Sequence, residues 1–214
     1  MPKISIIIPA HNEEKYIEKT LHSIIMQDFK DYEVIVVCNG CTDKTEEIAK
    51  KHFTTISIKH PNIADARNIG AKVAKGEKLI FLDADTRLED RDILSKVNKS
   101  DAVIGTCFGR PNSYTFMNRG YFVFKNLFTL LGMVNGITFC DKKSFNEVGG
   151  FNKAKCPIEN RDLRIRITKY GKFEVLPRYV TTSMRRYEKL GFSRQLMYWI
   201  KRGFGSRGEY SNIR

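Results

Sequence analysis

Short apolar runs alternate with segments in which apolar residues recur every three or four positions, and this alternation fills the first hundred residues. The apolar runs predict buried strands at residues 4–8, 33–38, 54–58 and 78–82. The periodic segments predict helices at residues 13–25, 43–51 and 63–74. We expect Asn12 to cap the first helix, with Glu13 and Glu14 in its first turn. Strands that alternate with helices indicate an α/β protein with a mainly parallel, doubly wound sheet and helices on both faces.

The second half of the chain has a less regular pattern. Strands are predicted at residues 101–105, 136–140, 175–177 and 179–183. Helices are predicted at residues 114–131, 159–170 and 192–202, with a short helix that ends at Val148 before the turn Gly149-Gly150. The sequence contains no repeat and no clear linker. We therefore expect a single domain over residues 1–203, followed by a flexible basic tail at residues 204–214.

The chain is strongly basic, with 37 Lys and Arg residues, 24 Asp and Glu residues and a formal net charge of +13. The basic residues become denser toward the C-terminus, which suits a partner with phosphate groups or anionic lipid head groups. The N-terminus does not have the pattern of a secretory signal, and the nearest candidate for a membrane span, residues 120–139, is interrupted by Lys125. We expect a cytoplasmic protein, with peripheral contact at the cytoplasmic face of an anionic membrane as a further expectation.

Five cysteines, an odd number, favour reduced thiols over a disulfide framework. Cys38 and Cys41 form a Cys-x-x-Cys motif, for which a zinc or redox role is the alternative interpretation. A zinc site would need a second pair of ligands at similar spacing, and the remaining cysteines are scattered. We expect both side chains to be small, semi-buried groups at the end of a strand.

Asp83 and Asp85 follow the strand predicted at residues 78–82. Two carboxylates one residue apart repel each other unless a cation lies nearby. Their oxygens suit Mg²⁺ or Mn²⁺, which bind through one or two carboxylates and the phosphates of a substrate. An isolated Asp-x-Asp is more often only a loop. Here, however, residues 9–12 and Asn39 also follow strands, and ligands of parallel sheets bind beyond these carboxyl ends. The convergence predicts a metal–diphosphate site.

Six short segments resemble, in the same order, the motifs of the nucleotide-sugar glycosyltransferases of family 2. They lie at residues 6–14, 36–43, 66–70, 81–85, 147–151 and 159–163. Each is weak alone, but together they extend over most of the chain. A later segment, residues 182–187, resembles the closing motif of a small bacterial and archaeal subgroup. The resemblance implies a Rossmann-like GT-A fold, with a nucleotide-sugar-binding half at residues 1–100 and an acceptor-binding half at residues 101–203.

The resemblance also implies which residues hold the donor, a UDP-type or GDP-type sugar nucleotide. The loop after the first strand and Asn39 would bind the nucleoside, although the family usually has Asp at this position and Ser at that of Cys41. Asn39 can both donate and accept toward a base edge. The implied donor-binding residues are Pro9, Ala10, His11, Asn12, Glu13, Asn39, Arg67, Asn68, Asp83, Ala84, Asp85, Arg185 and Arg186.

Among these residues, Asp85 would be the direct ligand of Mn²⁺ or Mg²⁺, and Asp83 would contact the metal or the ribose. The cation would offset the negative charge of the departing nucleoside diphosphate. Arg67 and Asn68 would approach the diphosphate, and Arg185 and Arg186 would cap it, since guanidinium groups bind phosphate in bidentate fashion. The alternative for the arginine pair is solvated charge on a basic surface.

The acceptor side departs from the family pattern. Family members have an adjacent Glu-Asp, whose Asp is the general base in inverting enzymes, whereas this chain reads Glu159-Asn160-Arg161-Asp162. An amide does not take a proton at neutral pH, so Glu159 or Asp162 replaces the catalytic base, or the acceptor needs none. A polyprenyl phosphate is already ionised and would need none, whereas a saccharide would. The implied reaction is a metal-dependent, inverting transfer to a lipid-linked or saccharide acceptor.

Two other classes of protein remain as alternatives. Nucleotidyltransferases also combine a Rossmann-like sheet with a divalent metal, but they tend to carry a glycine-rich basic loop where residues 9–14 are acidic and free of glycine. A basic nucleic-acid-binding module would explain the net charge but not the acids at strand ends. We therefore expect no nucleic-acid partner.

Overall fold

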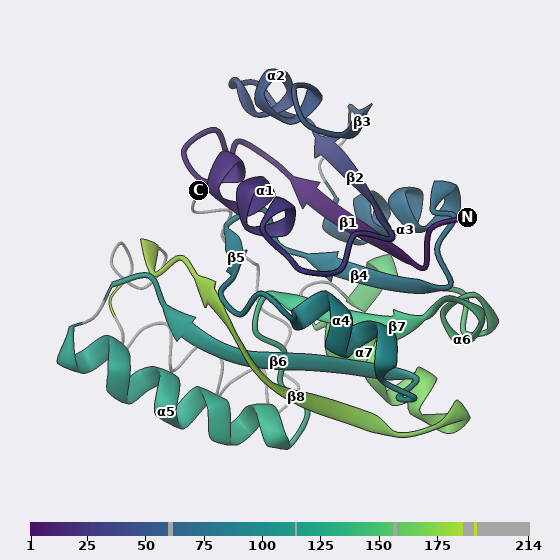
Figure 1. Cartoon of the computed structure of the whole chain (residues 1–214), viewed down its shortest axis with the longest axis vertical. Helices are drawn as coiled ribbons and strands as arrows, with labels where there is room; N and C mark the ends of the chain where they lie inside the picture. Colours follow the sequence, from purple (N-terminus) through teal and green to yellow (C-terminus); the bar gives the residue numbers. More distant parts are fainter. Residues whose placement is uncertain (60–61, 114, 156–157, 186–190, 192–214) are drawn as a thin grey trace.

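A single sheet with strand order β3-β2-β1-β4-β7-β6-β8-β5 forms the centre of the molecule (Figure 1). The structure, a computed structural model, describes residues 1–59, 62–113, 115–155, 158–185 and 191. The strands are β1 (Ile4–Ala10), β2 (Tyr32–Asn39), β3 (Thr54–Ile58), β4 (Lys78–Leu82), β5 (Thr86–Leu88), β6 (Ile104–Pro111), β7 (Ile137–Asp141) and β8 (Phe173–Thr182). The pairs β1–β2, β1–β4, β2–β3 and β6–β8 are parallel, and β4–β7, β6–β7 and β5–β8 are antiparallel. The predicted α/β class with a mainly parallel sheet is confirmed.

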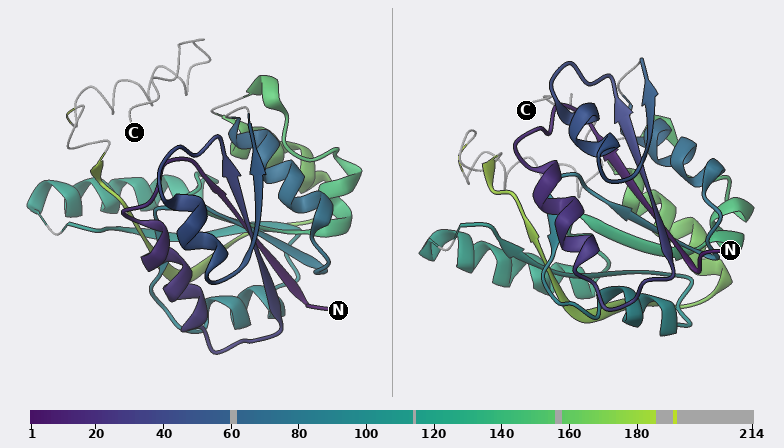
Figure 2. Two further views of the ribbon diagram at one scale, coloured as in Figure 1. Left: turned by 90° about the horizontal axis from the view of Figure 1, so that it is seen from above. Right: turned by 45° about the horizontal axis from the view of Figure 1, so that its top comes forward.

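Helices cover both faces of the sheet (Figure 2). They are α1 (Ile17–Ile25), α2 (Thr45–Lys50), α3 (Ile63–Val73), α4 (Ile93–Lys99), α5 (Phe116–Leu130), α6 (Lys142–Glu147) and α7 (Glu159–Ile167), with short 3₁₀ turns at Lys153–Lys155 and Thr168–Tyr170. Alternate β1 residues pack into different core clusters: Ile6 lies with α1 and α4, and Ile7 with α3, α6 and α7. None of the described helices combines the length and apolarity needed to cross a membrane.

The first helix starts later than the sequence predicts. α1 begins at Ile17, so Asn12 does not cap it and Glu13 and Glu14 lie outside it. Asn12 instead has a backbone φ of 55°, and its Oδ1 accepts a hydrogen bond of 2.8 Å from the backbone N–H of Thr42. The left-handed conformation is one that Asn tolerates better than most residues. The loop between β1 and α1 is thereby tied to the loop after β2.

The second half also differs in detail from the prediction. β6 runs from Ile104 to Pro111 instead of residues 101–105, because it pairs along its length with β8. The two extended segments predicted around Pro177 form one strand, β8, whose register shifts where Leu176 and Tyr179 oppose Cys107 and Phe108. Proline has no N–H to donate to a neighbouring strand, which explains the irregularity at this point. The predicted helix at residues 192–202 and the tail at residues 204–214 lie outside the described residues.

Candidate active site at the carboxyl edge of the sheet

Three parallel strands bring the predicted donor-site segments to one edge of the sheet. β1 lies between β2 and β4, with Ala10 opposite Cys38 and Ile7 opposite Phe81. The chain therefore leaves β1, β2 and β4 at the same end, where residues 11–13, Asn39 and Asp83 to Asp85 follow. The structure brings these segments together as the sequence predicts.

The loops after β1 and β2 hold each other through backbone contacts. The ring Nδ1 of His11 lies 2.6 Å from the carbonyl oxygen of Asn39. The side-chain Oδ1 of Asn39 accepts a 2.9 Å hydrogen bond from the backbone N–H of Asn62, which precedes α3. Because this oxygen is used by the backbone, the amino group of Asn39 is the better candidate to contact a base, as a donor.

A buried charge network joins the donor side to the acceptor side. Arg67, which is only 3% exposed, donates through Nη2 to Asp83 Oδ1 and through Nη1 to Glu159 Oε1, each at 2.9 Å. Burial alone would lower the pKa of the Arg67 guanidinium, but the charges of Asp83 and Glu159 outweigh it and raise the pKa. The arginine therefore stays charged and connects two carboxylates that the sequence assigned to different halves. Its guanidinium is committed to these partners.

A second arginine pairs with both Glu13 and Asp85. Arg185 binds both carboxylate oxygens of Glu13, with a distance of 2.7 Å to Oε2, and its Nη2 lies 3.2 Å from Asp85 Oδ2. Burial by itself would lower the pKa of Arg185, yet the hydrogen bonds to Glu13 and the charge of Asp85 raise it. The guanidinium also lies over the Tyr16 ring, 4.6 Å from its centroid. The structure thus places Arg185 next to the Asp-x-Asp, as the sequence predicts.

Other predicted site residues have structural partners. Asn68 binds the backbone of Phe151 twice, through both its amide nitrogen and its oxygen, each at 2.9 Å. Asp162 pairs with Arg166 one helical turn away, with Oδ2 2.9 Å from Nε. Both side chains are therefore engaged by partners within the protein. Arg186 lies outside the described residues.

Asn160, where the resemblance implies a general base, is the second residue of α7. Its Oδ1 accepts a long hydrogen bond of 3.4 Å from Thr138 Oγ1 on β7. Its neighbour Glu159 is 4% exposed, and one oxygen, Oε2, is buried without a hydrogen-bond partner among the described residues. The ion pair with Arg67 thus holds Glu159 at the site. Its Oε2 remains available for a ligand.

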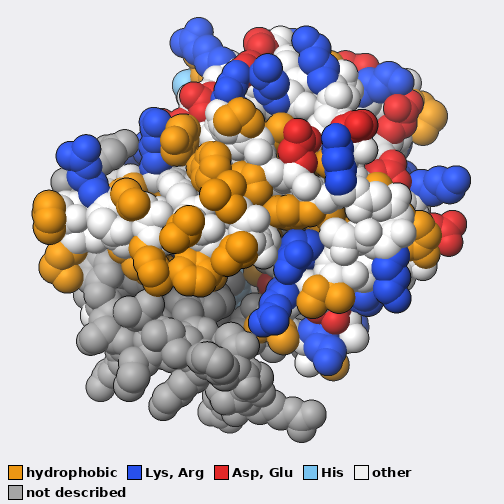
Figure 3. Space-filling model, turned by 90° about the horizontal axis from the view of Figure 1, so that it is seen from below, with side chains coloured by type: hydrophobic (Ala, Val, Ile, Leu, Met, Phe, Trp, Pro, Cys, Tyr) orange, Lys and Arg blue, Asp and Glu red, His pale blue; other side chains and the backbone are white. Residues whose placement is uncertain are grey.

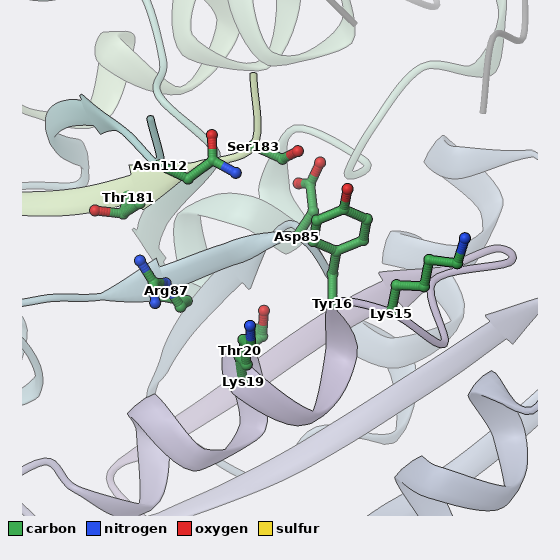
Figure 4. A pocket seen from close by; sticks show the side chains of 9 residues that line it. All are labelled: Lys15, Tyr16, Lys19, Thr20, Asp85, Arg87, Asn112, Thr181 and Ser183. Atoms are coloured by element: carbon green, nitrogen blue, oxygen red, sulfur yellow. The ribbon is translucent and has the colours of Figure 1, made fainter. Parts of the chain in front are cut away.

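A small pocket of about 160 Å³ opens beside Asp85 (Figure 4). Figure 4 shows the Asp85 carboxylate next to Tyr16 and facing Ser183. The pocket is lined by Lys15, Tyr16, Lys19, Thr20, Asp85, Arg87, Asn112, Thr181 and Ser183. Of these residues the sequence predicted only Asp85. Lys15 and Lys19 gave a usable signal, since two lysines at helical spacing follow the donor loop directly.

The pocket wall is cationic, and one of its residues has a buried hydroxyl without a partner among the described residues. Lys15, Lys19 and Arg87 carry its positive charges, against the single carboxylate of Asp85. The Oγ1 of Thr181 is buried and has no hydrogen-bond partner in the part of the chain that the structure describes.

Cys38 and Cys41 lie together at the end of β2. Their thiols hydrogen-bond, and this bond lowers the pKa of Cys41 to about 7. The Cys41 thiol also contacts the carbonyl oxygen of Ala10, at 3.4 Å, in the predicted nucleoside loop. Among the described residues no three His, Cys, Asp or Glu side chains are placed to hold a metal ion. The pair therefore acts in the structure as a link between β2 and the loop after β1.

The donor set fits a divalent cation that also binds a substrate. Asp85 and Glu13 already converge on one positive charge, that of Arg185, so this point of the site is negative and stabilises a cation. Carboxylate oxygens are the ligands that Mg²⁺ and Mn²⁺ prefer. Because the described residues offer fewer than three metal-ligating side chains in one place, phosphate oxygens of a substrate would complete the coordination.

Known proteins share sequence and fold with this chain. The sequence model of glycosyl transferase family 2 matches residues 5–190. A poly(ribitol-phosphate) β-N-acetylglucosaminyltransferase, TarS of Staphylococcus aureus, is 34% identical over 111 residues, 48% of this chain and 18% of TarS. The chain thus spans about a fifth of the length of this relative. A glycosyltransferase of PGL/p-HBAD biosynthesis from Mycobacterium bovis is 28% identical over 204 residues, 89% of this chain and 78% of the relative.

Solved structures share the fold at lower identity. A mannosyltransferase of Pyrobaculum calidifontis, in complex with GDP-Man and Mn²⁺, superposes with a TM-score of 0.72 and 18% identity, covering 97% of this chain and 66% of that one. TarS residues 1–349, in complex with UDP-GlcNAc, superposes with a TM-score of 0.69 and 19% identity, covering 85% of this chain and 58% of that one. The GT-A type of α/β fold is therefore confirmed.

Proposed function

Because the chain belongs to glycosyltransferase family 2, we propose that it transfers a sugar from a nucleoside diphosphate to a phosphate-bearing acceptor, with a divalent metal at Asp85. The observation that carries this proposal is the convergence of the β1 loop, Asn39 and the Asp-x-Asp at one edge of the sheet. The family match favours this function over a nucleotidyltransferase or a nucleic-acid-binding module.

The donor-binding half is built from residues 1–100. The loop of Pro9 to Glu13 and the amino group of Asn39 bind the nucleoside, and Asp83 is fixed by Arg67 toward the ribose. Structural neighbours bind UDP-GlcNAc or GDP-Man, which supports a donor of the UDP or GDP type. Arg185, whose Nη2 lies 3.2 Å from Asp85 Oδ2, would pair with the phosphates of a bound donor, and Asp85 would then hold the metal.

Asp85 would hold Mn²⁺ or Mg²⁺ through its carboxylate oxygens, and Asp83 would contact the metal or the ribose. Such a cation stabilises the negative charge that develops on the leaving diphosphate. The solved mannosyltransferase contains Mn²⁺ together with its donor, which supports this choice of metal. The chain's own contribution is to hold Asp83 rigid through Arg67 and to hold Arg185 within reach of the phosphates.

The acceptor in this proposal carries a phosphate. Lys15, Lys19 and Arg87 make the pocket beside Asp85 positive. An ionised phosphate oxygen can attack the anomeric carbon as the bond to the diphosphate breaks, without giving up a proton. This single displacement inverts the configuration and explains why an amide, Asn160, can stand where other members have a base. For a saccharide acceptor, the free oxygen of Glu159 is the base available.

Charge reversal in the pocket tests the acceptor class. With Mn²⁺ and the preferred sugar nucleotide, we expect Lys19→Glu to raise the KM for a polyprenyl phosphate about tenfold, since losing one charged contact removes roughly 1.5 kcal/mol of binding. The KM for the donor should change little. Steady-state release of nucleoside diphosphate measures both constants.

The matched control is Lys99→Glu, an exposed residue at the end of α4 that carries the same change in charge outside the pocket. Transfer to a neutral saccharide but to no prenyl phosphate would reject the phosphate acceptor and assign base catalysis to Glu159. No transfer from any UDP-sugar or GDP-sugar to either class of acceptor would reject the proposed function. We also propose that the protein meets a lipid-linked acceptor by peripheral contact with an anionic membrane.

A further inference from the structure

Helix α5 has its hydrophobic side turned outward. Seven large apolar residues on or next to it are between 50% and 94% exposed: Phe116, Met117, Val123, Phe124, Leu127, Leu130 and Leu131. Most of them recur at intervals of three or four residues, so they form one stripe along the helix. Figure 3 shows hydrophobic side chains gathered over this part of the surface. A surface helix of a water-soluble domain normally turns such a stripe toward the core.

The inner side of α5 is largely polar. Asn126 binds the backbone N–H and carbonyl of Gly109 on β6, both at 2.9 Å. Thr129 is fully buried, and its hydroxyl accepts a 2.6 Å hydrogen bond from Asn135. Phe122 is the large apolar side chain of the helix that is buried, against Met184. These contacts fix the orientation of α5, so the outward stripe is a built feature of the fold.

The segment of sequence that contains α5 carries charge of one sign. Residues 102–140 contain no Asp or Glu, and they include Arg110, Arg119 and Lys125. Arg119 lies exposed on α5 itself. The whole chain carries a net charge of +13. A long exposed apolar stripe, on a segment of sequence with basic and no acidic residues, is complementary to an anionic bilayer, where apolar side chains enter the acyl boundary and basic ones meet the head groups.

We propose that α5 lies in the plane of an anionic membrane and binds it through the stripe of Phe116, Val123, Phe124, Leu127 and Leu131. The helix begins four residues after Asn112, which lines the pocket beside Asp85. Docking by α5 thus places the acceptor pocket close to the lipid surface. The role that we give to membrane binding rests on the proposed function. Lipid binding itself is measured without donor or acceptor, so an experiment can reject the membrane site and leave the proposed function standing, or the reverse.

Vesicle co-sedimentation of the full chain tests the inference. At low salt we expect binding to vesicles of phosphatidylcholine with phosphatidylglycerol and at least tenfold weaker binding to phosphatidylcholine alone, because basic side chains near an anionic surface are attracted to its head groups. The double variant Phe124→Glu/Leu127→Glu should weaken binding to the anionic vesicles by at least tenfold.

The control is Val73→Glu/Ile165→Glu, which changes two exposed apolar residues on α3 and α7 and adds the same charge. It should bind lipid nearly as the unchanged chain does, which separates the stripe from net charge. If the double variant on α5 does not fold, Phe116→Glu replaces it, since a side chain that is 94% exposed contributes little to folding.

Three outcomes would overturn the inference. The first is no binding to anionic vesicles, and the second is equal weakening by the α5 variant and its control. The third is a concentration-dependent dimer in light scattering that the α5 variant abolishes while lipid binding stays unchanged, since a second copy would then cover the stripe.

Discussion

Replacing Asp85 with asparagine is expected to lower the rate of sugar transfer about a thousandfold, because a Lewis-acid contact of several kcal/mol is lost and about 1.4 kcal/mol corresponds to a factor of ten. The change keeps the size of the side chain and removes the charge that the metal needs. Arg185 keeps its two hydrogen bonds to Glu13, so the site should not collapse. The measurement is release of nucleoside diphosphate with saturating Mn²⁺, together with thermal unfolding.

Asp101→Asn is the matched control, because Asp101 has 81% of its side chain exposed and pairs only at the surface with Lys172. We expect its activity to equal that of the unchanged chain. Full activity of Asp85→Asn at saturating metal would contradict the assignment of Asp85 as the metal ligand. Activity lost together with a large fall in melting temperature would instead assign Asp85 to folding.

Removing Arg67 is expected to have the largest effect on stability. In Arg67→Met, the side chain of Glu159, which is 5% exposed, loses its cation, as does Asp83. Breaking a buried ion pair from one side destabilises a protein by about 3–5 kcal/mol, because the remaining charge stays buried without compensation. In a chain of this size the loss corresponds to a fall in melting temperature of about 10 °C. Urea unfolding measures the free energy directly.

A double variant separates the charge effect from loss of packing. Glu159→Gln removes the orphaned charge, so Arg67→Met/Glu159→Gln should be more stable than the sum of the single changes implies, by at least about 1 kcal/mol. Lys3→Met serves as the control, since its pair with Glu77 is exposed and contributes at most about 1 kcal/mol. Additive effects of the two buried changes would show that Arg67 and Glu159 do not interact as the structure indicates.

The sequence predicted the strands of the first half because their apolar runs are short and bounded by clear turn residues. β3 and β4 have the predicted limits, residues 54–58 and 78–82. The start of α1 was not predictable from the local pattern. Asn is a residue type that often caps helices, but Asn12 binds Thr42, which lies 30 residues away. Likewise, nothing near Arg67 in the chain points to Glu159, 92 residues away. Local propensity does not report such contacts.

In the candidate site, too, the sequence predicted some features and missed others. Motif order placed Asp83, Asp85 and Asn39 at one edge, because strand ends in a parallel sheet follow from topology. The roles implied for Arg67 and Asn68 depended on where their side chains point, and the structure shows both engaged with protein partners. The cationic pocket escaped prediction because Lys15, Arg87 and Thr181 come from three separate elements.

The central claim is that Asp85 binds a metal–diphosphate complex, and nucleotide-dependent thermal stabilisation tests it most directly. The full chain is heated with UDP, GDP, CDP or ADP, each with and without Mn²⁺. At a hundred times the dissociation constant a ligand adds about 2.7 kcal/mol, so we expect one nucleotide to raise the melting temperature by about 5–10 °C. The rise should require Mn²⁺ and should disappear in Asp85→Asn. No stabilisation by any nucleotide, or equal stabilisation without metal and in Asp85→Asn, would contradict the claim.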